Sequence, residues 1–182
     1  MTQLFPVLHL SIFRMHRAQM KEWTGIEIER ARQSLEHAAA PILGRMIFAF
    51  SRLDVALALH LVWSNQGSRL EELTREVEVL TFQKKLDFLL DLVTAKYNNQ
   101  EASSLYGQWL KDAHATRTMR NELVHGRWGT APTKNQVVNV VGLPTSSEQE
   151  SKSYTINELK KALDQMERLQ VRLAELREKY PV

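Results

Sequence analysis

Apolar residues recur every three or four positions along most of the chain, which is the spacing of one face of an α-helix. The strongest stripe lies within residues 42–63 and predicts a central, mostly buried helix. A mixed-charge stretch, residues 22–40, precedes it and is expected to form a separate helix that ends at Pro41, because proline lacks the amide hydrogen of a helix interior. The central stripe consists of Ile42, Met46, Phe50, Leu53, Leu57 and Leu61.

Polar residues 64–67 predict a stop after the central helix. Ser68 with Glu71 forms a capping-box pattern, so the next helix is expected to begin there and to continue through residue 93 with a bend near Thr81. A loop that begins at residue 98 leads into a helix predicted to run from Ser104 to His125. The inward side of that helix is predicted to consist of Leu105, Trp109, Ala113, Met119 and Leu123.

Gly126 is expected to end this helix in the left-handed conformation, which glycine adopts at little cost. Residues 128–153 are typical of loops, although residues 137–141 predict a short strand or half of a hairpin. Thr155 with Glu158 is a second capping box and predicts the start of a long amphipathic helix. Its stripe consists of Leu159, Leu163, Met166, Leu169, Leu173 and Leu176.

These elements predict an all-α fold, an up-and-down helical bundle with a loop or short hairpin insertion before the last helix. No internal repeat or long linker divides the chain, so we expect a single domain overall. Within it, residues 1–41 are expected to form an N-terminal segment and helix packed on a bundle of residues 42–182.

The composition of the chain excludes several classes of site and of cellular location. The 182 residues are 43% hydrophobic and 25% charged, which is typical of one globular domain with a sizeable core. The absence of cysteine excludes disulfides, thiolate metal sites and a cysteine nucleophile, and fits a reducing compartment. Residues 4–13 are apolar but too short to span a bilayer, and no basic residue precedes them. We therefore expect a cytoplasmic protein without membrane association, and the sequence holds no motif for a metal or a cofactor.

Positive charge gathers late in the chain. The formal net charge is +3, and residues 111–135 alone carry five basic against two acidic side chains. This balance favours an anionic partner, with a solvated helix face as the alternative. The five basic residues are Lys111, Arg117, Arg120, Arg127 and Lys134.

The centre of this basic region combines Arg120, Asn121 and His125 at a predicted helix end. Arginine offers a rigid fork to phosphate oxygens, and histidine can donate or accept a proton near neutral pH. Asn121 could orient the imidazole or hold a ribose hydroxyl. Together these groups suffice to cleave RNA by attack of its own 2′-hydroxyl, a reaction that needs neither a metal nor a protein nucleophile.

Helical geometry separates the two key groups. Asn121 and His125 share a strip of the helix with His114 and Arg117, whereas Arg120 lies about 140° from His125 around an ideal axis. The two groups can converge through the reach of the arginine, through loosening at the Gly126 end, or across a dimer. Arg117, His114 and Arg127 are further candidates for RNA binding.

Structural alternatives exist for each candidate. Arg120 could form an ion pair within the bundle, and His125 could cap the carbonyls of its own helix. Asp54, the only acidic residue of the predicted central helix at residues 42–63, could orient the motif from behind or lie on a wetter side of its helix.

The run of residues 120–126 resembles the signature of HEPN-domain proteins, the higher eukaryote and prokaryote nucleotide-binding superfamily. In that signature an arginine, often followed by asparagine, precedes a histidine by a few residues. The helical layout over residues 42–178 is loosely similar as well. The resemblance implies that Arg120 contacts the phosphate, that Asn121 is the polar residue with an orienting role and that His125 is the catalytic histidine.

The resemblance further implies a metal-independent endoribonuclease, and a homodimer in which paired motifs form one cleft. Many members are toxins of toxin–antitoxin pairs or act in phage defence, so an antitoxin or another regulatory protein is a candidate partner besides RNA. One toxin subgroup carries a modified tyrosine where this chain has Arg127, so pairing with a nucleotidyltransferase antitoxin is not supported. Some members are non-catalytic, and the alternative is therefore a helical dimerisation or nucleotide- and RNA-binding module.

Overall fold

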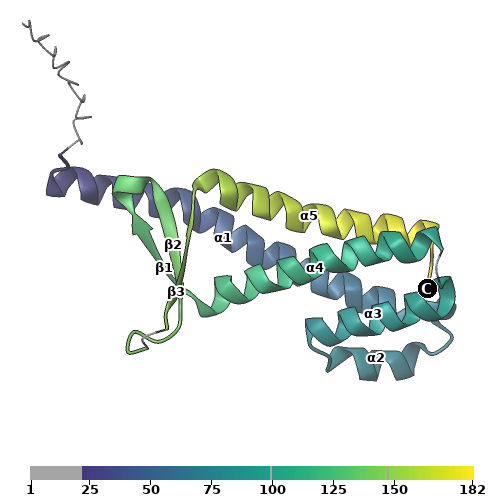
Figure 1. Cartoon of the computed structure of the whole chain (residues 1–182). Coiled ribbons are helices and arrows are strands. Elements are labelled where there is room, and N and C mark those ends of the chain that lie inside the picture. Colours follow the sequence, from purple (N-terminus) through teal and green to yellow (C-terminus); the bar gives the residue numbers. More distant parts are fainter. Residues whose placement is uncertain (1–21, 99, 147) are drawn as a thin grey trace, which may run out of the picture.

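The fold comes from a computed structural model that describes residues 22–98, 100–146 and 148–182 (Figure 1). This part of the chain is a mostly helical bundle with a small antiparallel sheet inserted before the last helix, as the sequence predicts. The helices are α1 (Gly25–Val62), α2 (Leu70–Glu78), α3 (Phe82–Tyr97), α4 (Glu101–His125) and α5 (Ile156–Lys179), and the strands are β1 (Arg127–Ala131), β2 (Gln136–Val141) and β3 (Glu150–Tyr154).

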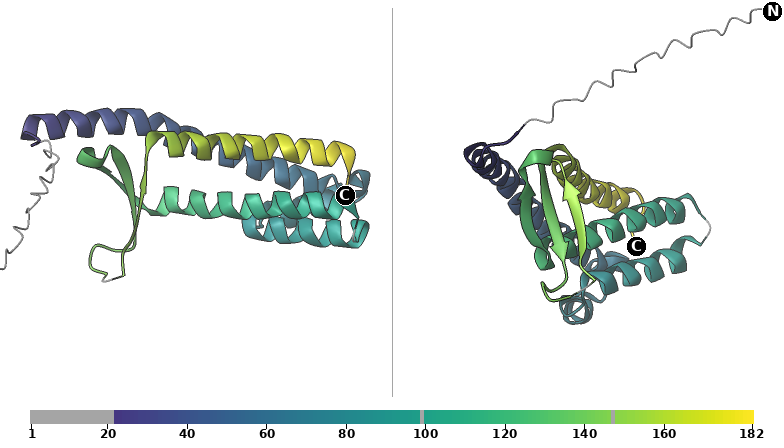
Figure 2. Two further views of the ribbon diagram at one scale, coloured as in Figure 1. Left: turned by 45° about the horizontal axis from the view of Figure 1, so that its top comes forward. Right: turned by 60° about the vertical axis from the view of Figure 1, so that its left-hand side comes forward.

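The bundle is built around α1 and α5, which run in the same direction, with α4 antiparallel to both (Figures 1 and 2). The short helices α2 and α3 cover one end of the bundle, and the sheet stands at the other end, where α4 ends and α5 begins. Both α1 and α5 contribute to each of two apolar clusters. Each residue of the predicted central stripe on α1 is buried, as is the α5 stripe from Leu159 to Leu173.

The two clusters divide the core along the bundle. The cluster at the α2–α3 end contains Trp109 and Tyr106 of α4, both fully buried. The cluster at the sheet end contains Leu123 of α4 and Val137 of β2. Between Ala113 and Leu123 the inward side of α4 is largely polar, so this helix crosses from one cluster to the other with few apolar contacts of its own.

The helix end expected at Pro41 is wrong. α1 continues through Pro41 as one helix of 38 residues. Leu35 and Ala39 before the proline, and Ile42 and Met46 after it, all lie in the cluster at the sheet end. Packing on both sides therefore outweighs the single hydrogen bond that proline removes. Residues 1–21 of the expected N-terminal segment lie outside the described residues.

The start of α2 also differs from the prediction. Ser68 has a helical backbone and caps nothing, and α2 begins at Leu70 without a side-chain cap. The reason is the tight turn before it, where Asn65, Gln66 and Gly67 all have positive φ. At the predicted bend the helix ends and a new one begins. Thr81 accepts a hydrogen bond from the amide of Lys84 and is the N-cap of α3, which is a separate helix.

The start of α4 differs from the prediction, whereas the start of α5 agrees with it. α4 begins at Glu101, three residues earlier than predicted, and Leu105 is exposed while its neighbour Tyr106 is buried. The helix phase is set by the aromatic anchors, since Trp109 donates a hydrogen bond to the carbonyl of Leu169 on α5 at 2.9 Å. The capping box of Thr155 and Glu158 at the start of α5 is confirmed.

The sheet is larger than the sequence predicts. Residues 137–141 do form a strand, but β1 and β3 flank it in the order β1-β2-β3, both antiparallel to it. β1 and β3 carry few apolar residues because only one side of the sheet meets the bundle, through Val137 and the partly buried Trp128 and Tyr154. The description of residues 128–153 as loop-rich is therefore wrong for β1 and β3.

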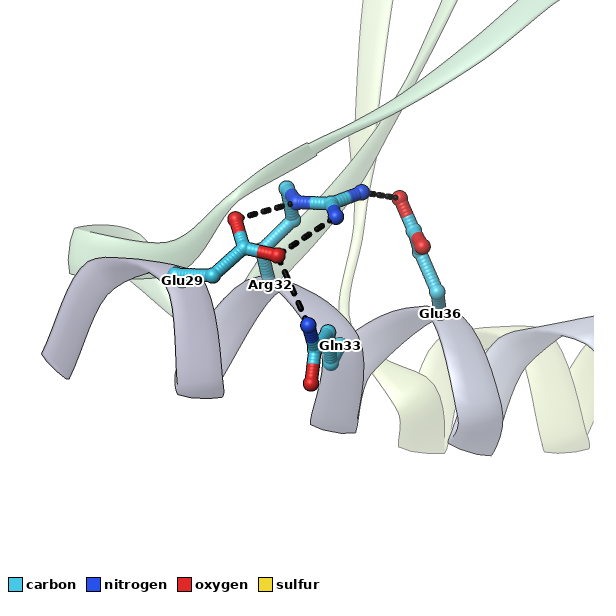
Figure 3. A network of polar contacts seen from close by, with 4 residues as sticks. All are labelled: Glu29, Arg32, Gln33 and Glu36. Carbon is cyan, nitrogen blue, oxygen red and sulfur yellow. Dashed lines mark hydrogen bonds and ion pairs between the residues drawn. The ribbon is translucent and has the colours of Figure 1, made fainter. Parts of the chain in front are cut away.

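The N-terminal half of α1 carries a network of charged side chains (Figure 3). Arg32 bonds Glu29 through two nitrogens and Glu36 through a third, at 2.6–2.8 Å, and Gln33 also bonds Glu29. The hydrogen bond from Arg32 lowers the pKa of Glu29 to about 2. Here an exposed arginine is neutralised by carboxylates one turn away on either side.

None of the helices in the described ranges is both long and apolar enough to cross a lipid bilayer.

The buried His60 makes stability depend on pH. Burial, aided by the positive charge of Arg177, lowers the pKa of His60 from 6.5 to about 4. Such a group binds protons preferentially in the unfolded chain, so its contribution is intact above pH 6.5 and is lost as the pH falls towards 4. We expect the free energy of unfolding to decrease by up to about 3 kcal/mol across this range.

The variant His60→Gln tests this origin. Tyr106 donates its hydroxyl hydrogen to the carbonyl of Tyr180, so His60 donates to the Tyr106 oxygen, as a glutamine amide also can. Urea unfolding at about pH 7, 5.5 and 4.5 should show a shallower pH dependence for this variant than for wild type. The exposed control His37→Gln should behave as wild type, and an unchanged slope in His60→Gln would contradict the assignment.

Candidate functional site

Arg120 lies half-buried on the inward side of α4, where that helix faces α1. Its guanidinium stands over the ring of Phe50 at 5.5 Å from the centroid and donates a hydrogen bond to the side-chain oxygen of Asn121 at 3.3 Å. Within the described ranges no carboxylate lies within ion-pair distance of it. The alternative of an ion pair within the bundle is therefore wrong for this part of the chain.

His125 is the last residue of α4 and is exposed. Its ring makes no hydrogen bond to any described residue, so it does not cap its own helix. α4 remains regular through His125, so loosening of the helix does not bring this ring towards Arg120. One chain thus presents Arg120 and His125 in different directions, with Asn121 beside the arginine.

Side chains from all three strands hold the last turn of α4. Asn139 of β2, only 2% exposed, donates a hydrogen bond to the carbonyl of Glu122 at 3.1 Å. Trp128 of β1 donates to the carbonyl of Leu123 at 3.2 Å. The Glu122 carbonyl also accepts the backbone amide of Gly126 at 2.9 Å, so Asn139 is its second donor. Trp128 supplies a donor to the Leu123 carbonyl, which is one of the last carbonyls of the helix, where backbone donors run out.

The Glu122 carboxylate is held from β3. Lys152 forms an ion pair with one oxygen, and the hydroxyl of Tyr154 donates to the other at 3.0 Å. Burial raises the pKa of Tyr154 to about 12, with a further contribution from Glu122. Both oxygens of Glu122 are therefore engaged, and this acidic residue inside the motif fixes the turn that carries His125.

Gly126 does not adopt the predicted left-handed conformation. Its φ of −81° and ψ of 156° are ordinary extended values that lead directly into β1. Glycine is required here for space: a Cβ would lie 2.1 Å from the side-chain oxygen of Asn139. The same asparagine that caps α4 thus excludes any side chain at residue 126.

The remaining candidate residues from the sequence lie on α4, β1 and α1. His114 and Arg117 are half-buried on α4, while Arg127 of β1 is exposed and bonds Gln149 at 2.9 Å. Asp54 forms an ion pair with Lys85 of α3 at 2.7 Å. No contact between Asp54 and the motif is found in the described ranges, so its structural partner is α3.

A groove of about 580 Å³ lies elsewhere on α4, between this helix and α5. Its floor includes Met119, Met166 and Leu169, and its rim carries Arg168 and Arg172. None of the three motif residues lines it. Within the described ranges, no three histidine, aspartate or glutamate side chains come together in a way that could hold a metal ion.

Sequence reasoning missed Glu122, Asn139, Lys152 and Tyr154 as positioning residues. One signal is present in the sequence, since Asn139 interrupts a run of valines at residues 137–141. A polar residue there must find a partner, and the sequence alone does not show that the partner is the end of α4.

Comparisons of the chain with protein-family models, with curated proteins and with solved structures found no match.

The close approach of Gly126 and Asn139 predicts a coupled pair of substitutions. Gly126→Ala should lower the free energy of unfolding by about 1–3 kcal/mol, because the new methyl displaces the Asn139 side chain. Asn139→Ala should cost a similar amount, because the Glu122 carbonyl loses a donor. The double variant should lose at least about 1 kcal/mol less than the sum, since alanine at residue 139 leaves room for the methyl.

Urea unfolding of the three variants gives the coupling energy. The matched control is Gly107→Ala on the exposed side of the same helix, where a Cβ meets nothing within 4 Å. It should stabilise the protein by up to about 1 kcal/mol through helix propensity. Strict additivity of Gly126→Ala and Asn139→Ala would show that the two residues do not compete for space.

Proposed function

We propose that the protein is a metal-independent endoribonuclease of the HEPN type that acts in the cytoplasm as a homodimer. The observation that carries the proposal is Arg120, a half-buried arginine without a carboxylate partner in the described chain, on the same helix end as an exposed histidine. An arginine in this state is available to a phosphate, which it can bind in a bidentate manner without losing its charge.

The chemistry follows from these groups. The 2′-oxygen of the RNA attacks the adjacent phosphorus, the bond to the 5′-oxygen breaks, and a 2′,3′-cyclic phosphate and a 5′-hydroxyl result. Arg120 stabilises the negative charge of the pentacoordinate phosphorus, and Asn121 holds its guanidinium. His125 either accepts the proton of the attacking 2′-hydroxyl as a base or donates a proton to the leaving 5′-oxygen as an acid.

A homodimer supplies what one chain lacks. The reaction needs an acid and a base, but the motif contains one histidine, and Arg120 and His125 lie about 140° apart on a regular helix. Two copies of α4 placed side by side would bring Arg120 of one protomer near His125 of the partner subunit. Arg127 and His114 would contact RNA at the rim of such a cleft.

The resemblance of residues 120–126 to the HEPN signature extends the proposal to biological role. The protein would act as a toxin or as a phage-defence component, with an antitoxin or another regulatory protein as its partner.

A non-catalytic dimerisation or nucleotide- and RNA-binding module is the second candidate. The observation that favours it is the packing of Arg120 on Phe50 and its bond to Asn121, which give the arginine a role in holding α4 against α1. On this reading, Arg120→Ala lowers the melting temperature or disrupts the dimer and leaves no cleavage to lose.

The test is incubation of purified protein with total RNA in EDTA. Wild type should cleave RNA and leave 2′,3′-cyclic phosphate ends, and His125→Ala should reduce the rate by about 10²–10⁴-fold at an unchanged melting temperature. The control His37→Ala removes an exposed histidine of α1 and should cleave as wild type.

Three results would contradict the proposal. They are a folded wild type that cleaves no RNA, cleavage that requires a divalent cation, and full activity in His125→Ala. The first, combined with RNA binding that Arg120→Ala abolishes, would favour the binding module.

A further inference from the structure

Arg117, one turn before Arg120 on α4, forms no ion pair with any residue that the structure describes. The residue is half-buried, and its Nε is a buried nitrogen without a hydrogen-bond acceptor in the described chain. Buried polar groups in folded proteins nearly always have a partner, so an exception requires an explanation. The two terminal nitrogens of Arg117 also make no hydrogen bond in the described chain, but they are not among its buried unpaired atoms, so an acceptor from outside the chain can reach them. The fold therefore binds this guanidinium at none of its three nitrogens.

Arg117 also lies next to Arg120, so the two positive charges repel each other. Residues three apart on a helix have their Cβ atoms about 5–6 Å from each other, and like charges at this spacing destabilise the helix. Neither arginine has a carboxylate within 4.0 Å in the described ranges. Two half-buried positive charges therefore stand together without compensation.

Nearby carboxylates do exist, but other cations already bind them. Asp54, one turn after Phe50 on α1, pairs with the buried Lys85 at 2.7 Å. Asp112 on α4 pairs with Arg172 at 2.6 Å. Glu122 is held by Lys152 and Tyr154. These three acids thus have other partners, and no carboxylate among the described residues pairs with the two arginines of α4.

Arg32 on α1 differs from Arg117 and Arg120 because it has carboxylate partners. That arginine is bonded on both sides by Glu29 and Glu36 (Figure 3). Glutamates at the same spacing, three residues before and four residues after, would have neutralised Arg117, yet residues 114 and 121 are histidine and asparagine. The described residues therefore supply no carboxylate that neutralises Arg117 or Arg120.

We propose that Arg117 binds the phosphate next to the one at Arg120, so that the site takes single-stranded oligonucleotides with at least two consecutive phosphates and discriminates against a single phosphate. Along α4 the order is Arg117, Arg120, His125, with Arg117 about 4.5 Å before Arg120 on the helix axis. Arg120 is held over Phe50 and by Asn121, and Arg117 projects about 60° away around the helix. A strand that runs along α4 therefore meets the two guanidinium groups in succession.

This inference rests on the proposed function for the identity of the ligand as RNA, and its test measures binding rather than cleavage. The protein is the His125→Ala variant, with and without Arg117→Gln, and fluorescence polarisation follows labelled uridine ligands. One ligand is a dinucleoside monophosphate, with one phosphate, and the other is a trinucleoside diphosphate, with two. The control Arg75→Gln removes an exposed arginine of α2.

Arg117→Gln should weaken binding of the two-phosphate ligand about tenfold and leave binding of the one-phosphate ligand within twofold. With a longer oligouridylate, the slope of log K against log salt should decrease in magnitude by about 0.7, the value for one lost phosphate contact on a single strand. Arg75→Gln should change neither quantity. Equal losses for both ligands would show that the two arginines hold one phosphate, and no loss would remove Arg117 from the site; both overturn the proposal.

Stability gives an independent readout. Without added anion, Arg117→Met should raise the melting temperature, because it removes an uncompensated charge next to Arg120. Inorganic phosphate should raise the melting temperature of wild type more than that of the variant. A variant that is less stable than wild type without anion would mark Arg117 as structural and overturn the proposal.

The two proposals can fail separately. If wild type cleaves no RNA but Arg117 still selects the two-phosphate ligand, the ribonuclease proposal fails and the two-phosphate site stands in a binding module. If wild type cleaves RNA and Arg117→Gln shows no selective loss, only the two-phosphate site fails.

Discussion

Two apolar stripes, one on α1 and one on α5, bury each other along the length of the bundle. Both core clusters contain residues of both helices, so this pairing joins the sheet end to the α2–α3 end. Continuous burial explains why α1 passes Pro41 without ending, since the lost hydrogen bond is small beside the apolar surface removed from water on either side of it. Every other element packs onto this pair.

Because α1 and α5 contribute to both core clusters, α4 does not need apolar residues along its whole inward side. Trp109 and Tyr106 anchor one end of α4 and Leu123 anchors the other, so the stretch between them can carry Arg117 and Arg120 on its inward side. A helix that had to fill the core along its whole length could not accommodate two half-buried arginines. The cost of these charges is local, and the stability that tolerates it comes from elsewhere in the bundle.

Much of the helical architecture could be predicted from the sequence because it depends on periodicity and on local caps. The α1 and α5 stripes and the Thr155 capping box are examples, since each is encoded within a few neighbouring residues. The errors have a common cause. Pro41, Ser68 and Gly126 were interpreted from local preference, whereas their conformations are set by packing, by a left-handed turn and by Asn139 respectively.

The residues of the candidate site are a prediction from the sequence, whereas the groups that hold them in place could not be predicted from it. Arg120, Asn121 and His125 stand out as a group of residue types at a helix end. The donors that fix this helix end come from three strands, two of which have no strong signal in the sequence. That no carboxylate of the described ranges pairs with Arg117 or Arg120 also depends on tertiary structure, because Asp54, Asp112 and Glu122 have other partners.

The bonds between the sheet and α4 also have a consequence for the order of folding. Asn139 and Glu122 are 17 residues apart, whereas Arg45 of α1 and Glu167 of α5, which form an ion pair, are 122 apart. Short loops close at a lower entropic cost than long ones, and local contacts form faster. We therefore expect the turn that carries His125 to assemble on the sheet early, before α1 and α5 come together, so that it is already in place when the long-range core closes around it.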